Sequence, residues 1–201
     1  MSTVPTLPGI TSQMVDTTRL KMHVLFSGPE NGTPVLLIHG NASSATYWEE
    51  IMLKLPDEFR GIAPDLRGYG YTEDKLIDAT RGAGDWVDDI LALMDALNID
   101  KAHVIGHSMG GTLVFNLVAT ASDRVLSGTV VDPGSPYGFG GSKGLDGVPC
   151  YDDFAGSGGG VVNPEFPRLM AAGDRSTDNP QASPRVVMNS FYWKPGFSWN
   201  C

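Results

Sequence analysis

The sequence has few cysteines, and their arrangement excludes two kinds of site. Cys150 and Cys201 are the only cysteines among 201 residues, and neither belongs to a CxxC motif or to a cluster with histidine. This pattern excludes a disulfide framework and a zinc site of the usual spacing. It favours a reducing, cytoplasmic compartment, with a single Cys150–Cys201 disulfide as the alternative.

Positive charge is also scarce. The chain has 14 lysines and arginines against 23 aspartates and glutamates, which gives a formal net charge of −9. The basic residues are scattered rather than clustered, so the chain lacks the electrostatic footprint of a nucleic-acid-binding protein. We therefore expect no nucleic-acid partner, and the acidity itself bears on solubility rather than on function.

Long hydrophobic runs are missing as well. The longest, VLLI at 35–38 and ILAL at 90–93, are far shorter than the roughly 20 residues that span a bilayer. Residues 1–15 have neither a basic start nor a sustained apolar stretch, so they do not resemble a secretory signal. We expect a soluble, cytoplasmic protein with no membrane partner.

Segments with strand and helix patterns alternate through residues 19–132. Residues 19–26 alternate in polarity like a half-exposed strand, whereas 35–38 are continuously apolar like a strand buried on both faces. Alternation at this spacing predicts an α/β fold, with a mostly parallel sheet flanked by helices on both faces. The further strands are predicted at 60–64, 102–106 and 125–132, and the helices at 44–55, 85–97 and 111–120.

The composition changes after Asp132. Residues 134–147 and 155–160 are so rich in glycine that we expect no regular element there. A low-complexity linker is one interpretation, but interleaved aromatic residues argue against free disorder because they need a surface to pack on. We divide the chain into a core region, 1–133, and a second region, 134–201.

The strongest chemical signal is GHSMG at 106–110. A G-x-S-x-G motif between a buried strand and a helix is typical of a nucleophile elbow, a sharp turn that holds the serine hydroxyl at the carboxyl edge of the sheet. The turn requires Gly106 and Gly110 because neighbouring backbone approaches closely, and Gly111 lets the helix pack. Ser108 is the predicted nucleophile, and the alternative is a serine that only forms a turn.

A second motif, HGN at 39–41, directly follows the buried strand at 35–38. Acyl transfer needs two N–H donors for the oxyanion, one from the residue after the nucleophile and one from the loop after the third strand. We assign these donors to the backbone N–H groups of Met109 and Asn41. His39 is interpreted as support for the loop and not as a proton-transfer group.

Three motifs together resemble the α/β-hydrolase superfamily. HGNASSATYW at 39–48, PDLRGYG at 64–70 and GHSMGG at 106–111 occur in the order and spacing of that superfamily, and the resemblance covers residues 15–133. The first two motifs are similar to the branch that contains haloalkane dehalogenases and epoxide hydrolases. Those enzymes carry aspartate at the elbow, whereas serine favours hydrolysis of an ester, lactone, amide or C–C bond through an acyl-enzyme.

The resemblance implies a catalytic acid after the sixth or seventh strand and a histidine after the eighth. Asp132, at the end of the sixth strand, is a candidate for the acid, and the alternative is that it only fixes the following loop. None of the four histidines is placed to take the Ser108 proton. They are His23, His39, His103 and His107. We therefore expect the base outside residues 1–201, on a C-terminal fragment of the same precursor.

The resemblance also implies a cap after the sixth strand, so residues 134–201 are interpreted as the start of a cap on an incomplete α/β-hydrolase fold. The predicted function is a serine hydrolase that acts on a small carboxylic ester or lactone, and no metal or organic cofactor is implied. An amide hydrolase or an acyltransferase of the same fold is the alternative among enzymes. A non-catalytic binding protein on this scaffold is the alternative outside them.

Overall fold

The computed structural model describes residues 4–78, 81–134, 142–143, 148–149 and 163–191. The chain divides into two compact units, Met1–Pro136 and Tyr137–Cys201, and each is described by itself. The sequence predicts a division after residue 133, slightly before the boundary after Pro136. No helix in the described parts of the chain has the length and apolar character to cross a membrane.

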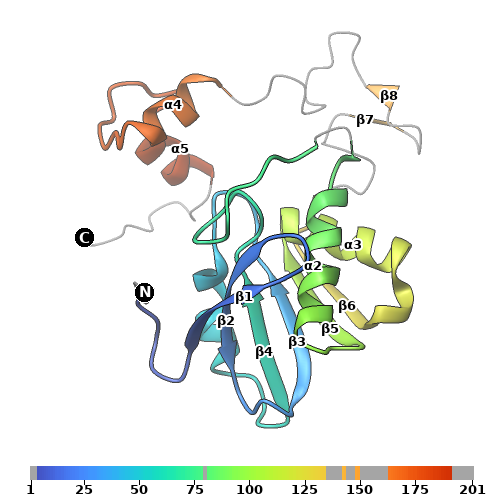
Figure 1. Cartoon of the computed structure of the whole chain (residues 1–201). Helices are drawn as coiled ribbons and strands as arrows, with labels where there is room; N and C mark the ends of the chain where they lie inside the picture. Colours follow the sequence, from blue (N-terminus) through green and yellow to red (C-terminus); the bar gives the residue numbers. More distant parts are fainter. Residues whose placement is uncertain (1–3, 79–80, 135–141, 144–147, 150–162, 192–201) are drawn as a thin grey trace. The chain divides into compact units, whose positions relative to one another are not determined.

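Unit 1 is built on a six-stranded sheet (Figure 1). Its order is β1-β2-β4-β3-β5-β6, in which the β1–β2 and β2–β4 pairs are antiparallel and the other neighbours are parallel. The mostly parallel sheet expected from the sequence is confirmed. The strands are β1 Thr11–Asp16, β2 Lys21–Ser27, β3 Thr33–Ile38, β4 Phe59–Pro64, β5 Ala102–His107 and β6 Val125–Val131.

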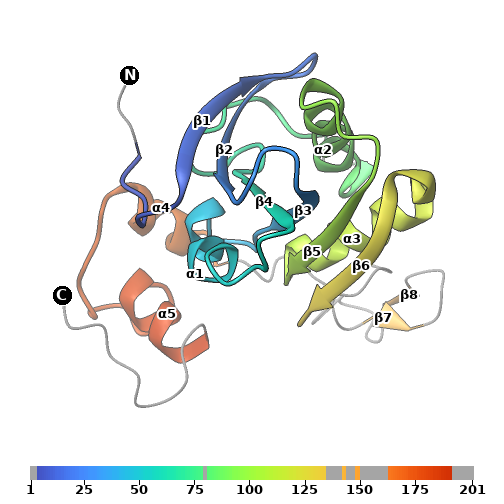
Figure 2. The same ribbon diagram turned by 90° about the horizontal axis from the view of Figure 1, so that it is seen from below.

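Helices cover both faces of this sheet (Figure 2). Helices α2, Gly84–Ala96, and α3, Met109–Thr120, pack on one face. A 3₁₀ turn, η1 Ala45–Trp48, and the short helix α1, Glu49–Met52, pack on the other. The helix expected at 44–55 is therefore shorter than predicted and divided into two pieces.

The core follows the alternation of side chains along the strands. In β3, Leu36 and Ile38 pack with helices α2 and α3. Val35 and Leu37 point the other way and pack with η1 and α1. Strand β3 is thus buried on both faces, as its continuous apolar run predicts.

Strand β2 differs from its expected half-exposed state, because every residue after Lys21 is buried. Its polar residues face the side of the sheet on which η1 and α1 pack, and they have buried hydrogen-bond partners there. The Ser27 hydroxyl donates to the carbonyl of Met52 over 3.2 Å, and His23 contacts Asp65. The alternation therefore reflects satisfied polar groups in the interior and not a solvent-exposed face.

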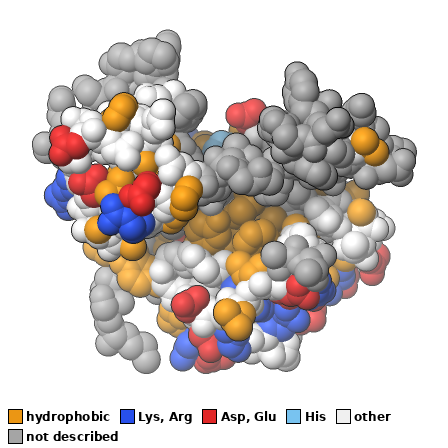
Figure 3. All heavy atoms as spheres, turned by 90° about the horizontal axis from the view of Figure 1, so that it is seen from above, with side chains coloured by type: hydrophobic (Ala, Val, Ile, Leu, Met, Phe, Trp, Pro, Cys, Tyr) orange, Lys and Arg blue, Asp and Glu red, His pale blue; other side chains and the backbone are white. Residues whose placement is uncertain are grey.

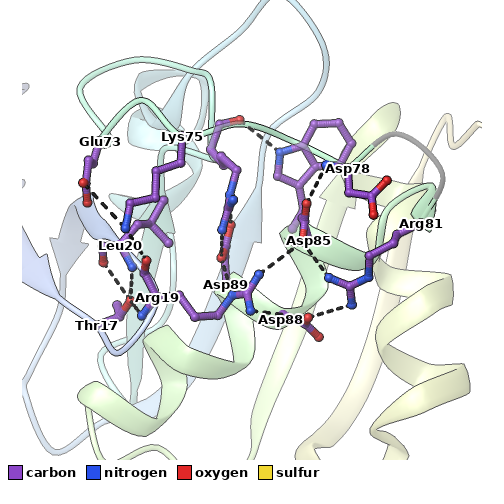
Figure 4. A network of polar contacts seen from close by, with 12 residues as sticks. Thr17, Arg19, Leu20, Glu73, Lys75, Asp78, Arg81, Asp85, Asp88 and Asp89 are labelled. Atoms are coloured by element: carbon purple, nitrogen blue, oxygen red, sulfur yellow. Dashed lines mark hydrogen bonds and ion pairs between the residues drawn. The ribbon is translucent and has the colours of Figure 1, made fainter.

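A network of ion pairs joins helix α2 to two loops (Figure 4). The carboxylate of Asp89 is fully buried and accepts from Arg19 Nε over 2.7 Å and from Arg67 Nε and one terminal nitrogen over 2.8 and 2.7 Å. Arg19 lies in the β1–β2 turn and Arg67 in the turn after β4. Because a buried carboxylate needs such partners, the three residues hold the turn after β4 against α2.

The described residues of unit 2 form two short helices and one small two-stranded ladder. The helices are α4, Glu165–Ala171, and α5, Pro184–Phe191, while β7, Ser142–Lys143, pairs antiparallel with β8, Val148–Pro149. The expectation that residues 134–147 hold no regular element is therefore wrong at β7. Cys150, Cys201 and most aromatic residues of this region lie outside the described residues.

Candidate active site

Ser108 lies at the carboxyl edge of the sheet, between β5 and α3. Its backbone has φ 53° and ψ −117°, a conformation that residues with a side chain rarely adopt. Neighbours hold it there, since its N–H donates to the carbonyl of Val131 and its own carbonyl accepts from Gly111, each over 2.9 Å. A strained serine at a strand-to-helix turn is the geometry of a nucleophile elbow.

Glycines make this turn possible by the absence of a Cβ. A Cβ on Gly106 would overlap the carbonyl oxygen of Gly110, and one on Gly110 would overlap that of Ile38. A Cβ on Gly111 would lie 2.7 Å from that of Pro133. The close approach expected at all three glycines is therefore confirmed, and it packs α3 tightly against the ends of β3 and β5.

The HGN loop lies directly against the elbow. A Cβ on Gly40 would be 3.0 Å from the Cβ of Ser108. Asn41 follows Gly40, and Met109 follows Ser108 as the first residue of α3, so the two predicted oxyanion donors belong to segments that touch at the predicted nucleophile. The N–H groups at a helix start lack intrahelical partners and favour negative charge.

His39 supports this loop through backbone contacts. Its Nδ1 donates to the carbonyl of Gly40 over 2.8 Å, and its Nε2 accepts from the N–H of Leu66 over 3.1 Å. Burial lowers the pKa of His39 and outweighs the hydrogen bond to Gly40, which acts to raise it. The imidazole is thus held neutral, in agreement with the interpretation of His39 as a structural residue.

Tyr69 is a site residue that the sequence analysis did not identify. Its hydroxyl lies 2.7 Å from Oδ1 of Asn41 and 3.6 Å from Sδ of Met109. Its ring meets the imidazole of His39 edge-on, with the centroids 5.1 Å apart. Tyr69 is the tyrosine of the DLRGYG motif, but no local pattern in the sequence indicates that its side chain contacts both predicted oxyanion residues.

The other three histidines are also engaged away from Ser108. The ring of His107 stacks on Tyr47, with centroids 4.9 Å apart. His103 contacts the hydroxyl of Ser127 over 2.7 Å, and His23 contacts Asp65 over the same distance. Among the described residues, no hydrogen bond joins a histidine to the Ser108 hydroxyl.

Asp132 follows β6 and is exposed, with φ 46°. The register pairs His107 with Val131, which brings Asp132 to the same edge of the sheet as Ser108. A positive φ is uncommon for residues other than glycine, although aspartate and asparagine tolerate it better than most. Its role as the catalytic acid stays a prediction.

A second serine shows the hydrogen-bond order of a catalytic triad. The Ser12 hydroxyl is 2.8 Å from His23 Nε2, and His23 Nδ1 is 2.7 Å from Oδ2 of Asp65. Asp65 is buried, which acts to raise its pKa, but the His23 contact and the N–H groups of Ala45 and Tyr71 hold that pKa below its usual value. These bonds join β1 and β2 to the turn after β4, which is a structural function.

Two surface hollows lie at the opposite edge of the sheet from Ser108. One, of about 440 Å³, is lined by residues that precede β5 and β6, among them Asp100 and Arg124. The other, of about 350 Å³, includes Ser27 and Phe59. Ligands of parallel α/β sheets bind at the carboxyl ends of the strands, so neither hollow competes with Ser108 as the candidate site.

Figure 3 looks down on the molecule from above the view of Figure 1 and shows hydrophobic side chains gathered near the middle of that face. In the described parts of the chain, no group of three or more histidine, cysteine, aspartate or glutamate residues could hold a metal ion.

Comparison with known proteins shows the family of this chain. The model of the alpha/beta hydrolase fold family matches residues 33–183. The chain is 34% identical over 124 residues to 2-hydroxymuconate semialdehyde hydrolase from Pseudomonas sp. (strain CF600), a match that covers 60% of this chain and 43% of that one. It is 31% identical over 116 residues to an uncharacterized carboxylesterase from Bacillus subtilis (strain 168), covering 57% and 38%.

A solved structure of a related protein is also similar to this chain. A Vigna radiata epoxide hydrolase mutant aligns with a TM-score of 0.57 and 31% identity, over 62% of this chain and 39% of that one. The chain therefore spans less than half the length of these relatives.

Proposed function

Because the chain belongs to the α/β hydrolase fold family, we propose that it carries the nucleophile of a serine hydrolase that acts on a carboxylic ester or lactone. The observation that carries this proposal is the conformation of Ser108. Its φ of 53° marks a strained serine at the start of α3, on the carboxyl edge of the sheet, where Gly40 of the HGN loop lies against it.

The geometry supports a two-step reaction. Ser108 Oγ attacks the carbonyl carbon and loses its proton to a histidine, while the N–H groups of Asn41 and Met109 stabilise the oxyanion. The carbonyl reforms, the bond to the leaving oxygen breaks, and that oxygen takes the proton. Water then hydrolyses the acyl-enzyme by the same steps and releases the acid.

Phosphonate labelling tests the nucleophile. The protein, expressed from its complete gene, is treated with an activated phosphonate, and the labelled peptide is identified by mass spectrometry. We expect label on Ser108 and its loss in Ser108→Ala, with hydrolysis reduced by several orders of magnitude. Ser12→Ala is the matched control, because Ser12 also contacts a His–Asp pair and should neither take label nor alter turnover.

The outcomes separate the alternatives. Hydrolysis of p-nitrophenyl esters and simple lactones, with no cleavage of the matching anilides, supports ester specificity. Cleavage of the anilides, or transfer of the acyl group to an added alcohol, favours an amide hydrolase or an acyltransferase. A folded protein whose Ser108 stays unlabelled supports a non-catalytic binding protein.

We further propose that the histidine comes from a C-terminal polypeptide of the same precursor. Two observations support this. Each histidine of the chain is engaged elsewhere. In addition, β6 ends the strand order of the sheet and exposes Leu126 by 48% and Val131 by 42%, which makes an apolar edge that another element can cover.

Mass analysis of the purified active protein under denaturing conditions tests this second proposal. We expect a polypeptide beyond residues 1–201 that carries a histidine, either as a continuation or as a separate fragment. Ester hydrolysis by residues 1–201 alone would contradict it. The cytoplasmic location stays a prediction that fractionation of the source cells can check.

A further inference from the structure

We propose that Tyr69 is a positioning residue of the oxyanion hole, which holds Asn41 and Met109 in place through its hydroxyl. The inference rests on the proposed function of Ser108 and adds a residue that does not itself touch the reacting atoms. Tyr69 is 28 residues from Asn41 and 40 from Met109 in the sequence, yet one phenol oxygen contacts both side chains.

The two contacts differ in strength. A hydroxyl has one proton, and the 2.7 Å distance to Asn41 Oδ1 is that of a full hydrogen bond. Thioether sulfur is a weak acceptor, so the 3.6 Å contact with Met109 Sδ is mainly packing. Tyr69 therefore bonds one residue of the predicted oxyanion hole and packs against the other.

The bond to Oδ1 also determines where the Asn41 backbone lies. Asn41 is exposed, and it follows Gly40, whose Cα lies against Ser108. Through Oδ1, Tyr69 ties this exposed residue to the turn after β4, and with it the backbone N–H that is the predicted oxyanion donor.

Tyr69 can position other residues because its own turn is fixed from two sides. The Tyr69 N–H donates to the carbonyl of Leu66 over 2.9 Å, and the Leu66 N–H donates to His39. On the other side, Arg67 is paired with buried Asp89, and its carbonyl accepts from Trp86 Nε1 over 3.0 Å. The rigid turn lets a single hydroxyl define where Asn41 lies.

Tyr69→Phe tests the inference, because it keeps the ring against His39 and removes only the hydroxyl. Loss of one oxyanion donor costs roughly a hundredfold or more in kcat, so misplacement of a donor should cost less, about tenfold. We expect kcat for a p-nitrophenyl ester to fall by about that factor with KM within about twofold, because the oxyanion forms only after binding. Tyr71→Phe is the control, since Tyr71 lies in the same turn and is 59% exposed.

A double-mutant cycle separates positioning from a merely structural role. Asn41→Ala keeps the backbone N–H and removes the acceptor of the Tyr69 bond. If Tyr69 acts through this side chain, Asn41→Ala should lower kcat by a similar factor and the double variant should be no worse than either single one. Multiplication of the two effects, or a Tyr69→Phe enzyme with wild-type kcat, would overturn the inference.

Activity measurements on two other variants ensure that the test gives a clear result. If Tyr69→Phe does not fold, Asn41→Ala alone decides, because unchanged turnover in that variant contradicts the inference. Ser108→Ala is measured in the same series. Activity that survives in Ser108→Ala refutes the proposed function itself, whereas an inactive Ser108→Ala with a fully active Tyr69→Phe refutes only the role of Tyr69.

Discussion

The N–H of Leu66 donates a hydrogen bond to Nε2 of His39 over 3.1 Å, and this bond exists only while that nitrogen is unprotonated. The pKa of His39 is lowered from 6.5 by burial. As the pH falls below 6.5, the unfolded chain takes up a proton at this residue before the folded protein does. The protein should therefore lose stability as the pH falls from 6.5 towards the lowered pKa.

Thermal unfolding measured across this pH range checks the expectation. His39→Gln removes the titration and keeps an amide that can replace both hydrogen bonds. We expect the variant to have a flatter dependence of the unfolding temperature on pH than the wild type. Parallel curves for the two proteins would show that His39 does not contribute to the acid sensitivity.

Asp89→Asn should be strongly destabilising. The carboxylate is fully buried and accepts bonds from both Arg19 and Arg67. Its neutralisation removes the charged partner of Arg67 and the nearest of the three carboxylates around Arg19, the others being Asp85 and Asp88. Breaking a buried pair on one side costs about 3 kcal/mol or more. Denaturant unfolding measures the loss, and Asp88→Asn, whose side chain is 37% exposed, should leave the midpoint nearly unchanged. Equal effects of the two variants would contradict this account.

Ser108→Gly should be more stable than Ser108→Ala. Both variants remove the hydroxyl, but only glycine adopts φ 53° and ψ −117° without strain. Relief of strain of this kind is worth about 1–3 kcal/mol, from which the greater entropy of unfolded glycine subtracts about 0.5–1 kcal/mol. Chemical denaturation of the two variants side by side gives the difference, and a less stable glycine variant would argue against a strained elbow.

Asp132→Asn tests the catalytic acid. Asparagine tolerates the positive φ of this position, so the substitution removes charge while keeping the backbone conformation. If Asp132 orients the histidine, kcat should fall by roughly ten-thousandfold. We expect instead a modest decrease, with the effect appearing in stability. A collapse of kcat at an unchanged unfolding temperature would identify Asp132 as the acid.

The sequence predicted those parts of the fold that depend on local patterns. The apolar run of β3 and the glycines around Ser108 are short-range signals, and the structure agrees with both. Strand β1 was missed because it is an edge strand whose residues are mostly exposed and show no apolar alternation.

Contacts between distant segments could not be predicted in this way. The Ser12–His23 contact depends on the antiparallel register of β1 and β2, and the contact of Tyr69 with Asn41 depends on how the turn after β4 meets the HGN loop. No periodicity in one segment reports on such a pairing. The sequence could therefore indicate a nucleophile and its donors but not the residue that connects them.

The shared carboxylate of Asp89 has a consequence for how related sequences can diverge. One acceptor serves guanidinium groups from two separate loops, so a change at position 89 weakens the anchoring of both arginines at once. A lineage that loses one member of the trio passes through an unstable intermediate. Positions 19, 67 and 89 should accordingly covary as a set when homologous chains are aligned.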